Sequence, residues 1–196
     1  MVKRTIQELT NSSHVYNPDA GQNLWWPAYD RLTLDPAINE YVYFATQKGA
    51  NNKKLSDTNW AAGGQMPANT AIGIEYLNFY YTPAAQKTSE EYSELLTALT
   101  TASFAFLIND KSPQYQRPLD AIFGNCMPLN IIDAAPLGQQ NLSQATFNSI
   151  NELHDIEIVL AGQCSFTPTI IWDTQIPDSM EGDKLMLEMV GERISG

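Results

Sequence analysis

Alternating apolar and polar positions dominate the chain from Glu40 onward and predict β-strands. Apolar side chains at every second position, in runs rich in β-branched and aromatic residues, are typical of half-buried sheets. Six such runs are bounded by Pro, Gly, Asn or Asp: EYVYFAT (40–46), TAIGIEYLNFYY (70–81), ASFAFLIN (102–109), DIEIVLAG (155–162), SFTPTIIWD (165–173) and KLMLEMVGE (184–192). Two shorter runs, LDAIFG (119–124) and PLNII (128–132), bring the expected total to about eight strands.

One segment has a helical period instead. In KTSEEYSELLTALTTA, Thr88 and Glu91 have the spacing of a capping box, and four apolar side chains recur on one helical face: Tyr92, Leu95, Leu96 and Leu99. This predicts one inserted α-helix at about 88–101. A second, weaker helix or turn is predicted in LSQATFNSINEL (142–153).

Residues 1–38 follow neither period. They mix turn-forming residues with Trp25, Trp26 and Tyr29, which predicts an irregular N-terminal arm whose aromatic side chains cover the body of the same subunit or contact a neighbour. The chain has no internal repeat or linker, so we expect a single domain over 39–196. About eight strands and one helix favour an all-β fold, an eight-stranded antiparallel jelly-roll sandwich.

The long loop KKLSDTNWAAGGQMPANTA (53–71) separates the first two predicted strands. Asp, Thr and Asn are turn formers, glycines permit positive φ, and proline fixes the approach to the next strand. Trp60 is its one aromatic side chain, so we expect Trp60 to anchor the loop on its own sandwich or on an adjoining subunit. The loop is interpreted as a shaped connection in which Trp60 is largely buried in the assembled state.

The charge, the length of the apolar runs and the number of cysteines exclude several classes of function. The net charge is −11, and only 17% of residues are charged. Direct nucleic-acid binding is not expected, because phosphate neutralisation needs clustered Lys and Arg. The densest basic spot is Lys53 with Lys54, which we expect to be a solvated loop tip. No run reaches the roughly 18 apolar residues of a membrane span. Cys126 and Cys164 are too few for a disulfide framework, and their redox state stays open.

Residues for nucleophilic catalysis are sparse. A nucleophile needs an adjacent base, and the two histidines are His14, in the arm, and His154, beside Asp155 before a strand. Cys164 falls between two predicted strands with no histidine near it in sequence. No phosphate-binding or dinucleotide-binding glycine motif occurs. We therefore expect no catalytic residues and no cofactor.

Two binding or catalytic alternatives stay open. A β-sandwich glycosidase needs two facing carboxylates, and the mid-strand candidates are Glu75, Glu157 and Glu188. Strict alternation, however, places Glu75 beside Leu77 on a strand that is apolar on both faces, which favours a buried or interface-covered strand. A lectin-like module would use exposed tryptophans for sugar stacking: Trp25, Trp26, Trp60 and Trp172. The acidic stretch PDSMEGDK lacks calcium-loop spacing, so no metal is expected. It predicts a solvated turn that includes Asp178, Glu181 and Asp183.

The order FATQKG…KKLSDTNWAAGGQMP before a long strand, with LMLEMVGERI as the last strand, resembles small single jelly-roll and related capsid proteins of icosahedral bacteriophages, including tailless phages with an internal membrane. The resemblance covers about residues 40–81 and the last dozen. The matching residues are Phe44, Thr46, Gly49, Lys54, Leu55, Asp57, Thr58, Asn59, Gly64, Gln65, Pro67, Gly191 and Arg193.

This resemblance implies a structural role in a virion. It implies an eight-stranded jelly roll in two four-stranded sheets, made in the host cytoplasm and assembled with copies of itself and other capsid proteins, as a major or minor subunit. The N-terminal arm would tie capsomers together or approach an internal lipid membrane. The family supplies no catalytic residues. Candidate assembly or anchoring contacts are Trp25, Trp26, Tyr29, Trp60 and Trp172.

Overall fold

The protein is described here from a computed structural model, in which most of the chain forms antiparallel β-sheets. The structure describes residues 22–68, 70–85, 87–109, 111, 113, 115–123, 147–152 and 158–195. The predicted strand at 128–132, the arm before residue 22, and His14, Cys126, His154 and Glu157 therefore lie outside the described residues.

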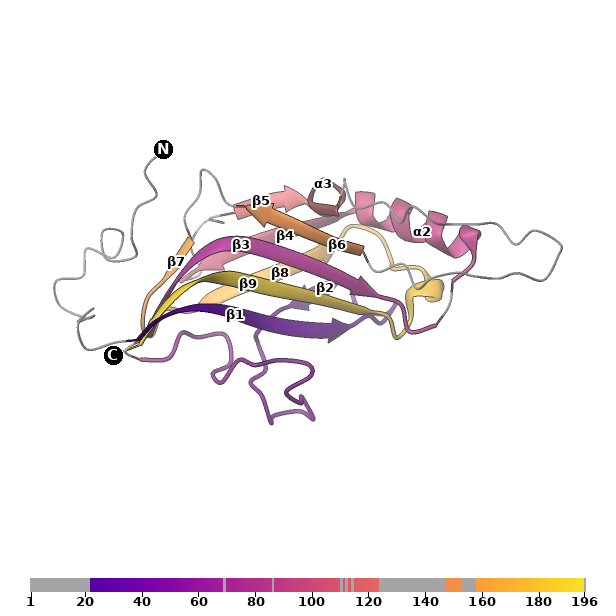
Figure 1. Ribbon diagram of the computed structural model, residues 1–196. Helices are drawn as coiled ribbons and strands as arrows, with labels where there is room; N and C mark the ends of the chain where they lie inside the picture. The colour runs from indigo at the N-terminus through magenta and orange to yellow at the C-terminus, as the bar shows by residue number, and fades with distance from the viewer. Residues whose placement is uncertain are drawn as a thin grey trace.

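Two sheets face each other as a sandwich (Figure 1). The first sheet has the order β1-β9-β3, with β6 and β7 along the outer edge of β3. Its strands are β1 (Gln22–Thr33), β3 (Thr70–Thr82), β6 (Phe147–Glu152), β7 (Ile158–Leu160) and β9 (Lys184–Ser195). The second sheet has the order β2-β8-β4-β5. Its strands are β2 (Glu40–Val42), β4 (Ala102–Ile108), β5 (Tyr115–Pro118) and β8 (Phe166–Trp172).

The amino-terminal segment differs from its prediction. Residues 22–33, expected in an irregular arm, form strand β1, which pairs with β9 over its whole length from Gln22↔Ser195 to Thr33↔Lys184. The prediction failed because Trp25, Trp26 and Pro27 break the period of two that marks a strand, whereas the long partner β9 supplies the hydrogen bonds. The sandwich therefore begins before residue 39, and the loop of 53–71 joins its second and third strands, not its first two.

Three segments predicted from local sequence patterns can be compared with the structure. Helix α2 (Ser89–Thr100) confirms the inserted helix, and both bonds of the capping box between Thr88 and Glu91 are present. The run expected as a strand at 119–124 is wrong, because Leu119–Phe123 form the short helix α3. The weak helix expected at 142–153 is wrong for residues 147–152, which form β6 on the edge of β3. Strand β5 was not predicted.

A β-bulge changes which side chains of the long strand β3 share a face. The pairing with β9 shifts between Ile74 and Tyr76, so that Glu75 is the extra residue. Side chains on both sides of the bulge therefore face the same core, and all are buried: Ile72, Ile74, Leu77, Phe79 and Tyr81. Strict alternation had placed these residues on opposite faces, and that prediction was wrong because a bulge shifts the alternation by one residue.

Gly191 on β9 is the counterpart of this bulge. A Cβ atom at Gly191 would lie 1.8 Å from the carbonyl oxygen of Gly73, well inside van der Waals contact. The close approach of the two backbones therefore requires glycine at this position.

The core between the sheets is rich in aromatic side chains. Phe79 of the first sheet and Phe104 of the second meet edge to face, with ring centroids 5.0 Å apart. Leu119 and Ile122 of α3 and Leu95 of α2 are also buried in this core. Figure 1 shows both helices beside β5 and β6, where they close one side of the sandwich.

Candidate functional site

The loop of 53–60 lies along the free edge of β1. On this strand the backbone groups of every second residue point away from β9, and the loop binds them in turn. The Arg31 N–H donates to the Asp57 carbonyl (2.7 Å), and the Asn59 N–H donates to the Tyr29 carbonyl (3.3 Å). The loop therefore acts as a short partner to an edge strand that would otherwise present open hydrogen-bonding groups.

The Asn59 side chain completes this edge cover. Its Oδ1 accepts from the Tyr29 N–H (2.9 Å), and its Nδ2 donates to the Pro27 carbonyl (2.7 Å). The Thr58 hydroxyl also donates to the Tyr29 carbonyl (3.1 Å). The phenol of Tyr29 donates to the Leu55 carbonyl (2.5 Å), so this predicted contact residue binds the loop of its own chain.

A buried carboxylate beneath the loop holds it in place. Asp30 is fully buried and forms an ion pair with the Lys53 ammonium, while its Oδ2 accepts from the Phe44 N–H at 2.6 Å. Burial raises the pKa of the Asp30 carboxyl above its ordinary value of 3.8, against the opposing effects of Lys53 and Phe44. Lys53, expected to be a solvated loop tip with Lys54, is therefore partly buried and paired.

Phe44 needs this support because its backbone is left-handed, with φ +60°. A bulky residue is rare in that region, and it persists only where the surroundings fix it. Here the Asp30 bond holds the Phe44 N–H, and the Phe44 ring packs edge to face on Trp60 with centroids 5.5 Å apart. The chain thus turns sharply out of β2 into the loop.

Trp60 and Trp172 are the predicted tryptophans whose side chains the structure describes, and both are 2% exposed. Trp60 packs edge to face on Phe166 as well as on Phe44, with centroids 5.2 Å from Phe166. It therefore anchors the loop on its own sandwich. Neither tryptophan offers a face to a sugar, which removes two stacking surfaces of the lectin alternative. Trp25 and Trp26 pair with Glu192 and Gly191, but their side chains lie outside the described residues.

A second buried ionic cluster joins the start of β9 to the segment before α2. Asp183 is fully buried; its Oδ2 lies 2.7 Å from the Lys87 ammonium and accepts from the Tyr81 phenol, and its Oδ1 accepts from the Ala84 N–H (2.7 Å). Lys87 also donates to the Ser179 carbonyl. Burial raises the pKa of Tyr81, as does the adjacent Asp183 carboxylate. Asp183, expected in a solvated turn, is therefore buried and paired, because its carboxylate holds the start of β9 to the segment before α2.

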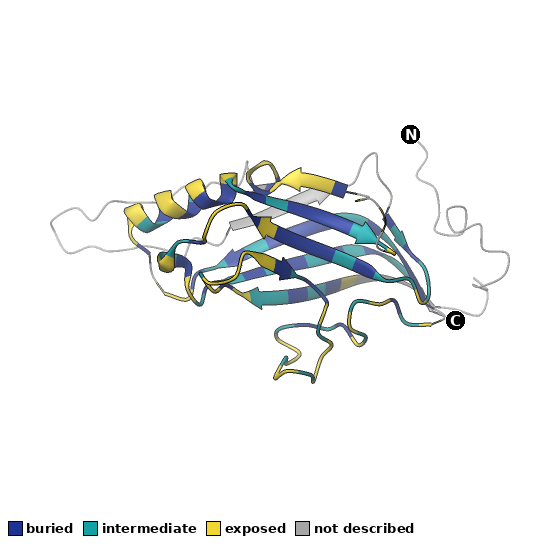
Figure 2. Cartoon of the chain, turned by 180° about the vertical axis from the view of Figure 1, so that it is seen from behind, coloured by how far each residue is buried: buried dark blue, intermediate teal, exposed yellow. Residues whose placement is uncertain are grey.

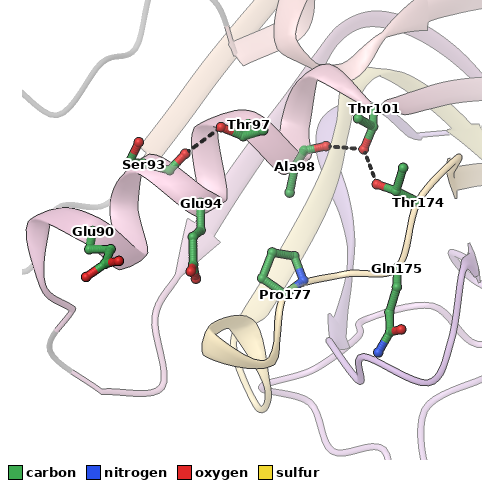
Figure 3. A pocket seen from close by; sticks show the side chains of 9 residues that line it. All are labelled: Glu90, Ser93, Glu94, Thr97, Ala98, Thr101, Thr174, Gln175 and Pro177. Atoms are coloured by element: carbon green, nitrogen blue, oxygen red, sulfur yellow. Dashed lines mark hydrogen bonds between the residues drawn. The ribbon is translucent and has the colours of Figure 1, made fainter.

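A groove of about 370 Å³ runs beside α2 (Figure 3). Hydroxyls and carboxylates line it, and Figure 3 shows the Thr101 and Thr174 hydroxyls bonded across it at 2.9 Å. Glu94 projects toward the turn after Pro177 and accepts from the Ser179 hydroxyl at 2.6 Å. The lining includes no imidazole, thiol or amine, so it holds no base paired with a nucleophile of the usual kind.

Among the described residues, the catalytic candidates Glu75 and Glu188 lie apart on the first sheet, because Glu188 pairs with Asn78, three residues along β3 from Glu75. Glu188 on β9 accepts from the Asn78 amide (2.9 Å) and the Tyr80 phenol (3.0 Å), whereas Glu75 sits at the bulge of β3. Cys164 is half-buried, and burial raises the pKa of its thiol, which opposes formation of the nucleophilic thiolate.

Within the described part of the chain, no group of three His, Cys, Asp or Glu residues could hold a metal ion. No helix described here is long and apolar enough to cross a membrane. The turn-forming residues and Trp60 marked the loop of 53–71 in the sequence, but its contact with the free edge of β1 was not predicted. The partner strand β1 was itself not predicted, so no signal pointed to the contact.

No known protein-family model matches the chain, and no curated protein sequence matches it either.

Proposed function

We propose that this chain is a structural virion protein, a single jelly-roll subunit of an icosahedral capsid without enzymatic activity. The observation that carries the proposal is the order of the strands. Strands β6 and β7 pair with consecutive parts of β3, from Tyr76 to Tyr81 and from Ile72 to Ile74. Counted as one interrupted strand, they give eight strands, in the orders 1-8-3-6 and 2-7-4-5.

This order is the one expected when a long hairpin of eight strands is rolled up. In such a hairpin the first strand pairs with the eighth, the second with the seventh, the third with the sixth and the fourth with the fifth. Rolling then brings the eighth beside the third and the seventh beside the fourth. Double-sheet jelly rolls of this kind occur in viral capsid proteins, and also in lectins and cupins. The order supports a jelly roll, and the capsid role rests further on the sequence resemblance.

The covered edge of β1 supports an assembling subunit. Copies of a sheet protein held at high local concentration are prone to edge-to-edge pairing. Here Asn59 and Asp57 occupy the groups that β1 would offer over residues 27–31. Assembly would then proceed through side-chain surfaces, as a closed shell requires.

The partners that follow are copies of this chain and other capsid proteins, in the virion. Low charge density suits such contacts, because a charge repeated in every copy adds unfavourably across symmetric interfaces. The approach of the N-terminal arm to an internal membrane remains a hypothesis from the sequence.

The test is assembly of the purified full chain. Light scattering coupled to size exclusion, with negative-stain electron microscopy across salt and pH, should reveal capsomers or closed particles. A chain that remains monomeric in every condition, alone and with the other capsid proteins of its virus, contradicts the proposal. A glycan array run in parallel should be blank, and specific sugar binding would favour the lectin alternative.

A further inference from the structure

The outer face of the β2-β8-β4-β5 sheet, called here the neutral face, carries fewer charged side chains than the outer face of the other sheet. Tyr41, Ile170 and Phe104 form one row across the sheet and are buried in the core, so the side chains of adjacent rows point outward. One outward row is Glu40, Ile171, Ser103 and Pro118, and the next is Val42, Thr169, Ala105 and Gln116. These two rows contain a single charged residue, Glu40, at the border of the sheet.

The opposite sheet shows a contrast. Its outward positions include charged residues of both signs: Arg31, Lys184, Glu188 and Glu192. Two copies of a chain with net charge −11 repel each other in general. The neutral face is a surface on which two copies meet with little repulsion.

The shape of the neutral face also suits a second sheet. Thr169 and Ala105, in the middle of the face, have small side chains that are 4% and 8% exposed. Figure 2 looks onto this sheet and shows no described helix in front of it. Small central side chains allow two sheets to approach to about 10 Å, the usual separation of packed sheets.

Two of the three exposed large apolar residues of the described chain lie at one end of this sheet. Ile171, on the neutral face, is 42% exposed, and Ile38, two residues before β2, is 43% exposed. Asn39 accepts from the Trp172 N–H at 2.9 Å, which holds the segment of Ile38 beside the end of β8.

We propose that the neutral face is a contact surface for a second copy of this chain, packed face to face. A two-fold axis parallel to the strands would place β2 of each copy over β5 of the other. Glu40 would then face the neutral residues Gln116 and Pro118 instead of the second Glu40. This proposal rests on the proposed capsid function and adds the surface through which two subunits of the assembly meet.

The size of the face sets the strength of the contact. Strands β2, β8, β4 and β5 contain 3, 7, 7 and 4 residues. At about 4.8 Å between strands and about 3.3 Å per residue they cover roughly 330 Å² per copy, less than half of the roughly 800 Å² typical of a stable pair. The contact is therefore expected to be weak and reversible on its own. Many weak contacts add when each subunit makes several at once.

The test compares three lysine variants of the full chain with the wild type by sedimentation equilibrium at concentrations up to about 1 mM. Ile171→Lys places a charge on the neutral face, and Leu55→Lys makes the same change at a 59% exposed residue of the edge-covering loop. We expect Ile171→Lys to weaken self-association at least about tenfold, while Leu55→Lys leaves it unchanged. Gln116→Lys, on another strand of the face, should repeat the effect, and equal melting temperatures check the folding of each variant.

A monomeric wild type at every concentration overturns the proposal, as does self-association that Ile171→Lys and Gln116→Lys leave intact. The neutral face would then belong to a different protein or to another segment of the chain. Electron microscopy separates this outcome from failure of the proposed function. Particles formed by Ile171→Lys as readily as by wild type would refute the neutral-face contact alone, whereas dimers through this face that never assemble further would refute the capsid role alone.

Discussion

The loop that covers the edge of β1 should be weakened by loss of the Asn59 side chain, and the hydrogen exchange of single amides can measure this change. Asn59→Ala removes two hydrogen bonds, the one from the Tyr29 N–H (2.9 Å) and the one to the Pro27 carbonyl (2.7 Å). Each such bond contributes about 0.5–1.5 kcal/mol net, which sets a limit of about 3 kcal/mol. Because water can reach the Pro27 carbonyl, we expect the free energy of unfolding to fall by about 1–2 kcal/mol.

Hydrogen exchange measured by NMR locates this loss. In Asn59→Ala the Tyr29 amide loses its acceptor, and we expect it to exchange at least about tenfold faster. The Ala28 and Asp30 amides point toward β9 and should keep their protection. Urea denaturation gives the global change, and the m-value should stay constant.

Two control variants sharpen this experiment. Asn59→Asp keeps an acceptor for the Tyr29 N–H but loses the donor to Pro27, so protection at Tyr29 should survive. Ser56→Ala changes an exposed residue of the same loop and should alter neither measurement. Unchanged exchange at Tyr29 in Asn59→Ala would refute the edge cover. A uniform loss over all of β1 would show that the loop supports the whole sheet instead of its edge.

Three further predictions concern residues away from this edge. Gly191→Ala should lower the unfolding free energy by about 3 kcal/mol in urea titrations, because its Cβ would overlap the Gly73 carbonyl; wild-type stability would contradict the close approach. Thr88→Ala should cost about 1 kcal/mol in thermal unfolding through loss of the bond from the Glu91 N–H, and an unchanged melting temperature would argue against the cap. For Asp30 the folded-state pKa is raised, so the stability contributed by its protonated form is present below pH 3.8 and is lost as pH rises through the folded-state pKa. The unfolding free energy of wild type minus that of Asp30→Asn should therefore fall with rising pH in that window, and a rise would contradict the burial of this carboxyl.

The sequence predicted those elements whose signals are local. Helix α2 was located through its capping box and apolar spacing, both contained within about four turns. Strands β3, β4, β8 and β9 were located through their period of two. Local signals misled where a partner distant in sequence decided the outcome. Residues 147–152 carry little strand pattern and form β6 because the edge of β3 is available to them.

The candidate site was also predicted only in part, for the same reason. Turn-forming residues and Trp60 marked the loop of 53–71 as a shaped and anchored segment, and the burial of Trp60 bears this out. What the loop covers could not be read from it, because the Asn59 amide binds backbone groups 30 and 32 positions away, on a strand that itself lacked a periodic signal. The pairing of Asp30 with Lys53 was equally hidden, since nothing in sequence marks an aspartate as buried.

Local sequence signals were sufficient to predict that the protein is built mainly of β-strands with one capped helix, and that the loop of 53–71 carries an apolar anchor. Periodicity and capping involve neighbours in the chain, so they act before any long-range contact forms. The strand order, the bulge opposite Gly191 and the burial of Trp172 became evident only in the tertiary structure. These features depend on backbone pairings such as that of Arg31 with Met186, 155 residues apart, which exist only once the sandwich has closed.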